Sequence, residues 1–422
     1  MISTKLIAID FGSSRISAMA AEVLENGAIR VLSEESKPSE DIKCGIVEKT
    51  TGASFKVSEL LKLLKNSARM QDISQVSVSI GAKSMKQQTI SISRFVGKPN
   101  TVTDSLLADM LEECENKTLK PNIDIYDVFP ISYSLDGERM DEPVGQNANQ
   151  ITAKYNVVYG QSIIKSGLVG CFDRTGIVLE YNPLTVDSLS TVVLEEQEKE
   201  VGCALINFGA TTTTLATYHE GILQNLLVVP LGAKNVTKDI QELGISEEHA
   251  ERFKCLKGVA LEKLVENPMY VEIPSEDESG SPVRISTKFL STIIEARLDE
   301  ILQPIFDIIF KLSFNLDAGI VITGGGSKLN NIIEFITEKT GIYTRHGDHS
   351  EWLSDDTDER FHDPCYAQLV GTILLTNEYR KEHPVEITIS EPDKMPKLPK
   401  KKFSEKITNR IFDFFNDDNK LN

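Results

Sequence analysis

The stretch LIAIDFGSSRIS, residues 6–17, decides the fold. An apolar run leads up to Asp10, then Gly12, Ser13 and Ser14 interrupt it, and a second apolar run follows. A short apolar run bounded by turn residues is consistent with a buried β-strand, and small residues between two such runs indicate a tight turn. The sequence therefore predicts a strand, a glycine turn and a second strand.

The same pattern recurs near the middle of the chain. The segment CALINFGATTTTLATYHEGIL begins at Cys203 and has Asn207 where the first copy has Asp10. Solenoid repeats have periods of about 20 to 50 residues, so a copy this distant indicates duplication of a whole domain. We therefore expect two related halves.

A phosphate group needs converging backbone N–H groups at a tight turn without bulky side chains. Both copies offer this, and a third turn, Gly324 to Gly326, follows the strand GIVIT and precedes a helical pattern. Asp10 could hold Mg²⁺ through water, because hard cations prefer oxygen ligands, and Arg15 could add a positive charge. The sequence has no G-x-x-x-x-G-K-[ST] motif, which argues against a P-loop protein.

Composition excludes several classes of function. The chain has 422 residues, 40% hydrophobic content and a formal net charge of -18, so we expect several domains and no nucleic-acid binding, which needs a basic surface. Its six scattered cysteines contain no C-x-x-C pair, which suits a reducing cytosol. We expect neither a signal peptide nor a membrane-spanning helix.

The order of these turns resembles the actin-type ATPase superfamily, and more closely the FtsA family, bacterial division proteins that tie FtsZ filaments to the membrane. The resemblance covers nearly the whole chain. It is carried by LIAIDFGSSRISAMAAEV, PVGQNANQITAKY, PLGAKNVTKDI followed by AERFK, IIEARLDEIL, GIVITGGGSKLNNI and DPCYAQLVGTILL.

The resemblance implies a two-lobed actin-like α/β ATPase fold with an inserted α+β subdomain and a C-terminal amphipathic helix on a flexible linker. The expected parts are the first lobe with phosphate hairpin 1 (1–79), the inserted α+β subdomain (80–165), the first lobe continued (166–200), the second lobe with phosphate hairpin 2 (201–245), a small FtsZ-binding subdomain (246–303), the second lobe with the adenosine turn (304–355), a closing helix back on the first lobe (356–380), a linker (381–399) and a membrane-targeting helix (400–422).

The resemblance also implies the residues of an ATP and Mg²⁺ site. The β- and γ-phosphates would meet the first turn and, opposite it, the second turn. Glu251 and Lys254 would flank the ribose and base, and the third turn would pack on the adenosine. The implied cofactor-binding residues are Gly12, Ser13, Ser14, Arg15, Gly209, Thr211, Thr212, Gly232, Glu251, Lys254, Gly324, Gly325 and Gly326.

The sequence departs from the family pattern at the second turn. Asn207 and Thr214 stand where the family usually has carboxylates, and Asn182 stands where an acid or amide positions the attacking water. An amide can bond a metal-bound water, but it brings no charge and cannot act as a base. Weak catalytic roles are thus left to Asp10, Asn182 and Asn207, and we expect ATP binding with slow or negligible hydrolysis. A cleft that binds nothing is the alternative.

The chain ends in an amphipathic pattern. At about 100° per residue, the apolar side chains of Phe403, Ile407, Ile411, Phe414 and Phe415 fall on one helix face. Residues 400–422 carry six basic and four acidic side chains, on a chain that is otherwise strongly acidic. We expect modest binding to an anionic membrane that becomes firm when many copies act together. Docking on a partner or on the body of the protein is the alternative.

The segment IIEARLDEIL places Arg297 and Glu300 three residues apart, on one helix face. The resemblance puts this helix in the subdomain that receives the C-terminal peptide of FtsZ, whereas a simple intrahelical ion pair is the alternative. The resemblance further implies self-association into filaments, other division partners on the inserted subdomain, and a peripheral location at the division septum, on the cytoplasmic face of the plasma (inner) membrane.

Parts of the sequence are compatible with two other functions and one metal site. A pilus-assembly scaffold of the PilM type shares the inserted subdomain, and a small-molecule kinase of the superfamily would need a carboxylate base, for which Asp10 is the candidate. His346, His349, His362 and Cys365 have spacings similar to zinc ligands, but such spacings arise easily in a polar loop.

Overall fold

The computed structural model describes residues 5–70, 73–98, 100–173, 175–274 and 282–383 of the chain. Contacts divide it into two compact units. The larger unit contains Met1–Gln87, Lys120–Tyr126 and Val158–Glu382, and the described part of the smaller unit contains Gln88–Leu119 and Asp127–Val157.

The first sheet of the larger unit contains five strands in the order β11-β6-β1-β2-β3. The strands β1 and β2 are antiparallel, as are β2 and β3, whereas β1 and β6, and β6 and β11, are parallel. Their bounds are β1 Lys5–Phe11, β2 Arg15–Val23, β3 Ile29–Pro38, β6 Gln75–Val78 and β11 Val178–Tyr181.

The second sheet of this unit repeats the first. Its order is β14-β13-β12-β17-β18, again with an antiparallel meander followed by two parallel neighbours. The bounds are β12 Cys203–Phe208, β13 Thr213–His219, β14 Ile222–Val229, β17 Ile320–Thr323 and β18 Thr344–His346.

The two glycine turns lie at matching places in these sheets. Asp10 faces Ser17 across the first hairpin, and Asn207 faces Thr214 across the second. Each turn thus has four residues between the last paired positions. Equal strand order and equal register confirm the predicted duplication into two related lobes.

Helices cover the first sheet on both faces. Ile7 and Ile9 pack with apolar residues of α1 and α3 in one buried cluster. Their neighbours Leu6 and Ala8 point to the opposite face because side chains alternate along a strand; they are also buried, and α10 contacts β1 there. The helices of this lobe are α1 Thr50–Ser67, α3 Ile163–Phe172, α4 Thr185–Val193 and α10 Ala367–Glu382, and a short hairpin, β4 Ile42–Lys43 with β5 Ile46–Val47, precedes α1. The helix α5 Glu196–Val201 follows α4 and contacts β13 of the second sheet.

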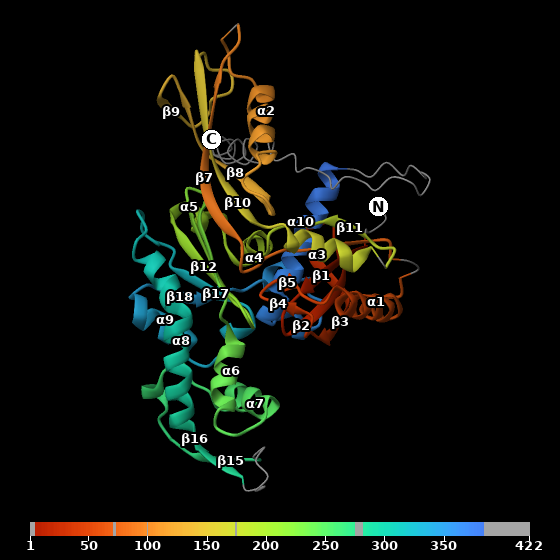
Figure 1. Cartoon of the computed structure of the whole chain (residues 1–422), viewed down its shortest axis with the longest axis vertical. Coiled ribbons are helices and arrows are strands. Elements are labelled where there is room, and N and C mark those ends of the chain that lie inside the picture. Colours follow the sequence, from red (N-terminus) through yellow and green to blue (C-terminus); the bar gives the residue numbers. More distant parts are fainter. Residues whose placement is uncertain (1–4, 71–72, 99, 174, 275–281, 384–422) are drawn as a thin grey trace, which may run out of the picture. The chain divides into compact units, whose positions relative to one another are not determined.

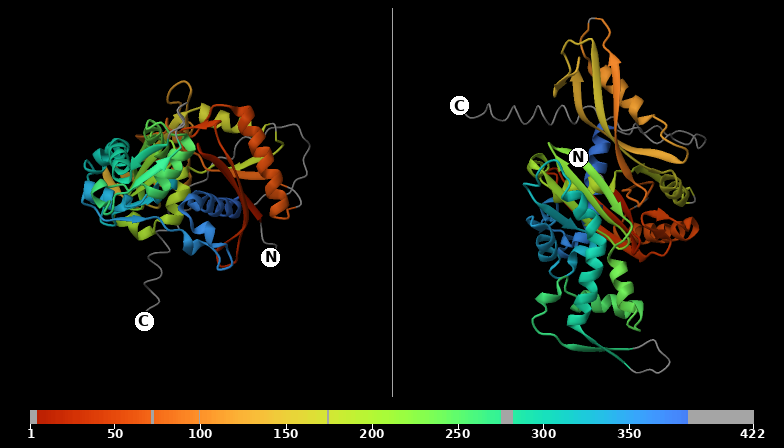
Figure 2. Two further views of the ribbon diagram at one scale, coloured as in Figure 1. Left: turned by 90° about the horizontal axis from the view of Figure 1, so that it is seen from below. Right: turned by 60° about the vertical axis from the view of Figure 1, so that its left-hand side comes forward.

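The second lobe contains one continuous core formed by its sheet and helices. In Figure 1 and Figure 2 the helices α6, α7 and α8 lie side by side, near a small hairpin formed by β15 and β16. The bounds are α6 Ala233–Gln241, α7 Glu247–Lys257, η1 Glu262–Leu264, β15 Tyr270–Ile273, β16 Val283–Ser286, α8 Thr287–Ile309, η2 Gly325–Lys328, α9 Ile332–Thr340, η3 Ser350–Trp352, η4 Glu359–His362 and η5 Pro364–Tyr366.

The smaller unit is built from one helix and most of a four-stranded sheet, ordered β7-β10-β8-β9. Thr103 caps the helix by accepting a hydrogen bond from the Leu106 N–H, and Met110 and Cys114 are its buried residues. The elements are α2 Asp104–Glu115, β7 Lys86–Phe95, β8 Ile123–Leu135, β9 Glu138–Met140 and β10 Gln150–Gln161. An α+β subdomain inserted in the first half is therefore present.

Two features are not evident from local sequence patterns. The helix α8 continues through Pro304 and ends at Ile309, although the proline removes one backbone hydrogen bond of the helix. The strand β8 was not predicted, because most of its residues are half-buried on both faces and give no alternation.

Candidate functional site

The first turn is flanked by Asp10, near the carboxyl end of β1. Gln368, in the first turn of α10, donates hydrogen bonds from Nε2 to Asp10 Oδ1 at 2.9 Å and to Ser79 Oγ at 2.9 Å. Burial raises the pKa of the Asp10 carboxyl to about 6, although the charge of Arg15 and the bond from Gln368 lower it. Near neutral pH this group is mostly a carboxylate, oriented by α10.

The turn itself has room only for glycine at its first position. A Cβ on Gly12 would lie 2.6 Å from the carbonyl oxygen of Arg15. The following Ser13 is half-buried and Ser14 is exposed, while the Ser14 carbonyl accepts a hydrogen bond from Ser39 N–H at 2.9 Å. The backbone of this hairpin is therefore fixed, and small polar residues form its tip.

A cationic side chain follows the first turn. The Arg15 guanidinium lies 5.6 Å from the centroid of the Tyr366 ring. Lys328, which follows the third turn, forms an ion pair with Asp363, and a hydrogen bond to Asp363 raises the pKa of Lys328. The charge of Arg15 favours an anionic ligand near the first turn.

The second turn is fixed to the helix that follows it. The Gly209 N–H donates to the Thr212 carbonyl at 2.9 Å. The first amides of α6, those of Ala233 and Lys234, donate to the carbonyl oxygens of Gly209 at 3.0 Å and of Ala210 at 2.8 Å. The N-terminus of α6 therefore binds the second turn, not an outside anion.

Gly232 and Thr211 complete the surroundings of the second turn. A Cβ on Gly232 would lie 2.5 Å from the Gly209 carbonyl oxygen, so glycine is required for this close approach. The Thr211 hydroxyl oxygen accepts a hydrogen bond from the backbone N–H of Cys44, in the first lobe, at 3.2 Å. The second turn thus contacts both its own lobe and the other one.

The third turn packs against the second hairpin. Gly324 has a φ of 86°, and a Cβ there would lie 2.4 Å from Asn207 Oδ1. A Cβ on Gly326 would lie 2.6 Å from the Phe208 ring, while one on the exposed Gly325 would lie 3.5 Å from the sulfur of Cys365. The structure therefore brings the second and third turns together.

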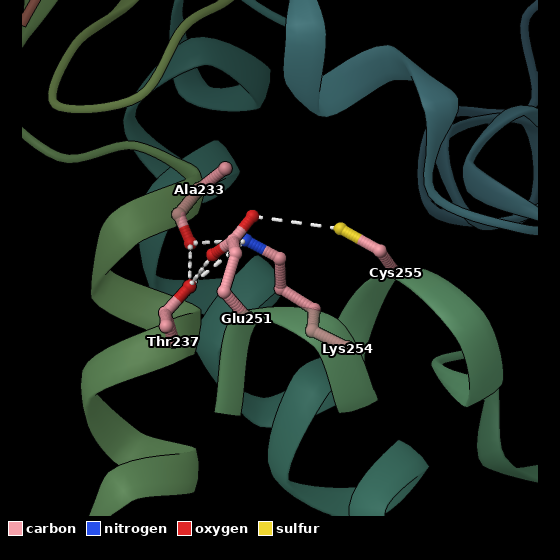
Figure 3. Close-up of polar contacts among 5 residues, drawn as sticks. All are labelled: Ala233, Thr237, Glu251, Lys254 and Cys255. Carbon is pink, nitrogen blue, oxygen red and sulfur yellow. Dashed lines mark hydrogen bonds and ion pairs between the residues drawn. The ribbon is translucent and has the colours of Figure 1, made fainter. Parts of the chain in front are cut away.

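Glu251 and Lys254 belong to a polar cluster between α6 and α7 (Figure 3). The buried Lys254 amine donates to Ala233 O at 3.1 Å, Thr237 Oγ1 at 2.9 Å and Glu251 Oε2 at 2.8 Å. Burial raises the pKa of Glu251, but the bonds and charge of Lys254 lower it more, so it lies below its ordinary value. Lys254 is thus bonded within its own lobe, whereas the half-exposed Glu251 side chain faces solvent in part.

The two amides assigned weak catalytic roles lie near carboxyl ends of parallel strands. Asn182 follows β11 and donates from Nδ2 to the carbonyl oxygen of Val78 at 3.1 Å. Val78 ends β6 and pairs with Ile9 of β1, so Asn182 lies at the same sheet edge as Asp10. Asn207 lies at the corresponding edge of the second sheet.

Arg297 ties two helices together. Its guanidinium pairs with both oxygens of Asp239 in α6, with Nη2 to Oδ1 at 2.7 Å, and it also pairs with Glu300. The side chains of Arg297 and Asp239 are about three-quarters buried, at 24% and 28% exposure, whereas Glu300 is 59% exposed. The structure therefore places Arg297 in an interhelical contact and leaves Glu300 at the surface.

The four candidate zinc ligands have other partners or stay apart. The His349 ring lies fully buried with Nε2 2.7 Å from the Phe361 carbonyl oxygen, and burial lowers its pKa. The His362 Nδ1 lies 2.7 Å from Ser350 Oγ. Within the described ranges, no group of three or more His, Cys, Asp or Glu side chains could hold a metal ion.

The predicted membrane residues Phe403, Ile407, Ile411, Phe414 and Phe415 and the linker before them, from residue 384 on, lie outside the described residues. Among the helices that the structure describes, none has the length and apolar character to cross a bilayer.

Sequence reasoning missed several residues of this site. Gln368 meets Asp10 beside the first turn, and Cys44 meets Thr211 in the second, each from a distant part of the chain. Ser79 accepts a hydrogen bond from Gln368, and Thr237 links α6 to the Glu251–Lys254 pair. No local pattern identifies them, because each contact depends on how the elements pack.

The donor set fits a nucleotide phosphate chain with Mg²⁺. Two hairpins present glycine-spaced backbone and the hydroxyls of Ser13 and Thr211, and Arg15 and Lys328 supply positive charge. Asp10 is the carboxylate available to a hydrated divalent cation. These are the residues that would hold the group.

Comparison with known proteins agrees with this geometry. Family models match residues 204–371 ("Cell division protein FtsA") and residues 82–159 ("SHS2 domain inserted in FTSA"). The chain is 26% identical over 373 residues to the cell division protein FtsA of Neisseria meningitidis, covering 86% of this chain and 88% of the relative. It is 24% identical over 401 residues to that of Borreliella burgdorferi, covering 94% and 96%.

Solved structures with a similar fold include the PilM-PilN type IV pilus biogenesis complex, with a TM-score of 0.63 and 15% identity over 89% of this chain and 99% of that chain. Another is MreB5 of Spiroplasma citri bound to ADP, with a TM-score of 0.56 and 12% identity over 90% and 98%.

The duplicated sheets, the paired glycine turns and these similar structures define a protein with the actin-like ATPase fold. Within that class, the matches in both the second lobe and the insertion identify the family. The chain belongs to the FtsA family of cell division proteins.

Proposed function

We propose that this protein binds ATP with Mg²⁺ between its two glycine hairpins. The observation that carries this proposal is the equal register of the hairpins, which sets Asp10 and Asn207 at equivalent edges of the two sheets. Bound Mg²⁺ would neutralise phosphate charge. Titration of the full chain with a fluorescent ATP analogue tests the proposal, and the absence of saturable binding would contradict it.

Hydrolysis is proposed to be slow or negligible. Asn207 brings no charge to the cleft, and the Asn182 amide already donates to the Val78 carbonyl, so neither can take a proton from water. Nucleotide then acts by favouring one arrangement of the lobes. A phosphate-release assay showing brisk turnover by the purified chain would contradict this part of the proposal.

The C-terminal peptide of FtsZ is the proposed partner of the small subdomain. A groove of about 320 Å³ lies there, and its wall includes the half-exposed Phe289 and the exposed Tyr270, with the Arg284 guanidinium 4.4 Å from the Tyr270 ring centroid. An apolar groove with one cation suits a peptide with apolar and acidic side chains. The exposed Glu300 lies on the same long helix as Phe289.

The test of this partner separates contact from stability. Because Arg297 ties α8 to α6, its reversal would perturb the fold, so Arg284→Glu and Phe289→Ala are the informative variants and Glu300→Lys is a third. Weaker binding of a synthetic FtsZ C-terminal peptide to these variants, with unchanged melting temperature, supports the proposal. Unchanged affinity in all three contradicts it.

Membrane anchoring is proposed for residues 400–422, through Phe403, Ile407, Ile411, Phe414 and Phe415. The support is their helical spacing and the basic character of this segment in an acidic chain. The protein would then anchor FtsZ filaments to the cytoplasmic face of the plasma membrane at the division septum. Co-sedimentation with anionic liposomes compares the full chain with one ending at Arg380, and equal pelleting contradicts the proposal.

Self-association into filaments and binding of other division proteins by the inserted subdomain complete the proposed function. Cross-linking with and without ATP tests self-association. Deletion of residues 88–119 and 127–157 would disrupt the fold too much to test partner binding by the inserted subdomain, so surface substitutions such as Phe95→Ser, at an exposed position of β7, are preferred. A PilM-like scaffold remains the second candidate, favoured by the similar fold of the PilM-PilN complex. The third candidate, a small-molecule kinase, predicts that the protein consumes ATP only when a small polyol is added.

A further inference from the structure

The carboxylate beside the first glycine turn is held by a glutamine from the far end of the chain. Gln368 lies in the first turn of α10, and its Nε2 donates to Asp10 Oδ1 and to Ser79 Oγ, each at 2.9 Å. An amide nitrogen has two N–H donors, so these two bonds use both. The Gln368 amide is therefore fixed by two acceptors.

The chemistry of the pair allows one orientation of this amide. An ionised carboxylate only accepts hydrogen bonds, whereas an amide presents a donor at one end and an acceptor at the other. Turning the amide over would place its oxygen against Asp10, where two acceptors repel each other. Gln368 thus presents its NH2 group to Asp10.

The backbone that carries Gln368 is fixed as well. Its neighbours Ala367 and Leu369 are buried. Three residues further on, a Cβ on Gly371 would lie 1.8 Å from the carbonyl oxygen of Ser188 in α4, so the two helices pack with their backbones in contact. The amide therefore cannot follow the carboxylate if the carboxylate rotates.

This contact leaves one oxygen of Asp10 for a ligand. Oδ1 accepts from Gln368, whereas Oδ2 accepts no hydrogen bond from the residues that the structure describes. Oδ2 lies 3.5 Å from the position that a Cβ on Gly12 would take, so it is the oxygen next to the first turn. A carboxylate oxygen with free lone pairs is what the waters of a hydrated divalent cation need.

We propose that Gln368 positions the cation-binding carboxylate: by holding Oδ1, it keeps Oδ2 of Asp10 toward the nucleotide and determines how strongly nucleotide binding depends on Mg²⁺. This inference rests on the proposed binding of ATP with Mg²⁺. Asn207, at the equivalent place of the second hairpin, brings no charge, so the orientation of this one carboxylate matters more. Gln368 is a positioning residue because it acts through Asp10.

The ratio of ATP affinity with Mg²⁺ to ATP affinity without it provides the readout. The full-length chain is titrated with a fluorescent ATP analogue in excess Mg²⁺ and again in EDTA, at pH 8. Gln368→Met keeps the length of the side chain but removes the amide. Hydrogen-bond partners of a metal ligand change metal affinity about 10- to 100-fold, and because this carboxylate acts through water we expect the ratio to fall about tenfold. A variant that only folds poorly would lower both affinities and leave the ratio unchanged.

Two further variants separate the amide from its surroundings. Gln303→Met removes an exposed amide that donates to Asp307 Oδ1 at 2.8 Å on α8, and it should leave the ratio unchanged. Ser79→Ala removes one of the two acceptors that orient the Gln368 amide but keeps Gln368 and Asp10. It should lower the ratio by about threefold, as expected for loss of one ordinary hydrogen bond.

A double variant tests whether Gln368 acts through the carboxylate. Asp10→Asn alone should lower the ratio at least as much as Gln368→Met. Residues that act as a unit are not additive, so adding Gln368→Met to Asp10→Asn should change the ratio by less than about twofold.

The outcomes separate this inference from the proposed function. An unchanged ratio in Gln368→Met, or a tenfold fall that persists in the Asp10→Asn background, overturns the positioning role. Equal affinity of the native chain for ATP with and without Mg²⁺ also overturns it and leaves nucleotide binding intact. A native chain that binds no ATP under either condition overturns the inference and the proposed function together.

Discussion

Replacement of Lys254 by methionine tests whether the Glu251–Lys254 cluster is structural. Methionine approximates the length of the lysine stem but lacks the amine that bonds Ala233, Thr237 and Glu251 (Figure 3). Breaking a buried ion pair costs about 3–5 kcal/mol when the partner stays buried. Here 48% of the Glu251 side chain is exposed, so water can solvate the carboxylate and offset part of the lost ion-pair energy.

The remaining cost comes from two acceptors, Ala233 O and Thr237 Oγ1, that each lose the hydrogen bond from the amine. Each ordinary hydrogen bond contributes about 0.5–1.5 kcal/mol, so we expect Lys254→Met to lower the free energy of unfolding by about 2–3 kcal/mol. With about 2–4 °C per kcal/mol for a domain of this size, the melting temperature should fall by roughly 4–12 °C without nucleotide. The matched control is Lys257→Met, on the exposed side of the same helix.

Thermal melts followed by circular dichroism, with ATP titrations on the same samples, measure both effects. A melting temperature unchanged by Lys254→Met, together with a large loss of ATP affinity, would contradict a structural role for the Lys254 amine and indicate that the amine binds the nucleotide.

Three further predictions follow from the same structure. Burial raises the pKa of Asp10 to about 6, well above its unfolded value of 3.8, so the native state binds a proton more tightly than the unfolded state and the free energy of unfolding falls as pH rises between these values. Asp10→Asn should remove this fall, measured by urea unfolding at pH 5 and pH 7. A variant with the same pH dependence as the native chain would contradict this prediction. Gly324→Ala should destabilise the second lobe by at least about 1–2 kcal/mol, because φ is 86° and the new Cβ meets Asn207. The control Gly341→Ala is also at positive φ but in open space, so it should cost only the free energy of placing alanine at positive φ. Equal unfolding midpoints for the two variants would contradict the close contact between Gly324 and Asn207. Arg297→Glu should lower the melting temperature because it places a carboxylate beside Asp239. Glu300→Lys, at an exposed position, should change the free energy of unfolding by less than about 1 kcal/mol. A larger loss of stability in Glu300→Lys than in Arg297→Glu would be inconsistent with the interhelical role of Arg297.

The sequence was sufficient for features that local patterns encode. The apolar runs around Asp10 and their copy around Asn207 predicted both hairpins, because strand composition and turn chemistry are short-range properties. The resemblance predicted the actin-like fold and the inserted subdomain, which the comparisons confirm.

Contacts between distant segments could not be predicted from the sequence. Gln368 meets Asp10 only because α10 returns to the first sheet, and Arg297 meets Asp239 only because α8 packs on α6. The same holds for Cys44 and Thr211, which approach across two lobes. Such contacts depend on packing, and packing leaves no periodic signal in the sequence.

Lys254 illustrates the limit for an assigned site. The resemblance indicates that it flanks the nucleotide, whereas its amine makes three bonds within the protein. The number of partners available to a buried amine depends on burial and geometry, and neither is readable from a helix pattern.

The most direct test of the account is calorimetric titration of the full-length chain with Mg-ATPγS, in native form and with Gly12→Val or Gly209→Val. Both substitutions put side-chain atoms into turns where an added Cβ would lie within 3 Å of a backbone carbonyl oxygen, at 2.6 Å for Gly12 and 2.9 Å for Gly209. We expect one saturable site per native chain and loss of binding in each variant, with the native circular dichroism spectrum retained. Native-like binding by both folded variants, or no binding by the native chain, would contradict the claim that two duplicated hairpins hold the triphosphate.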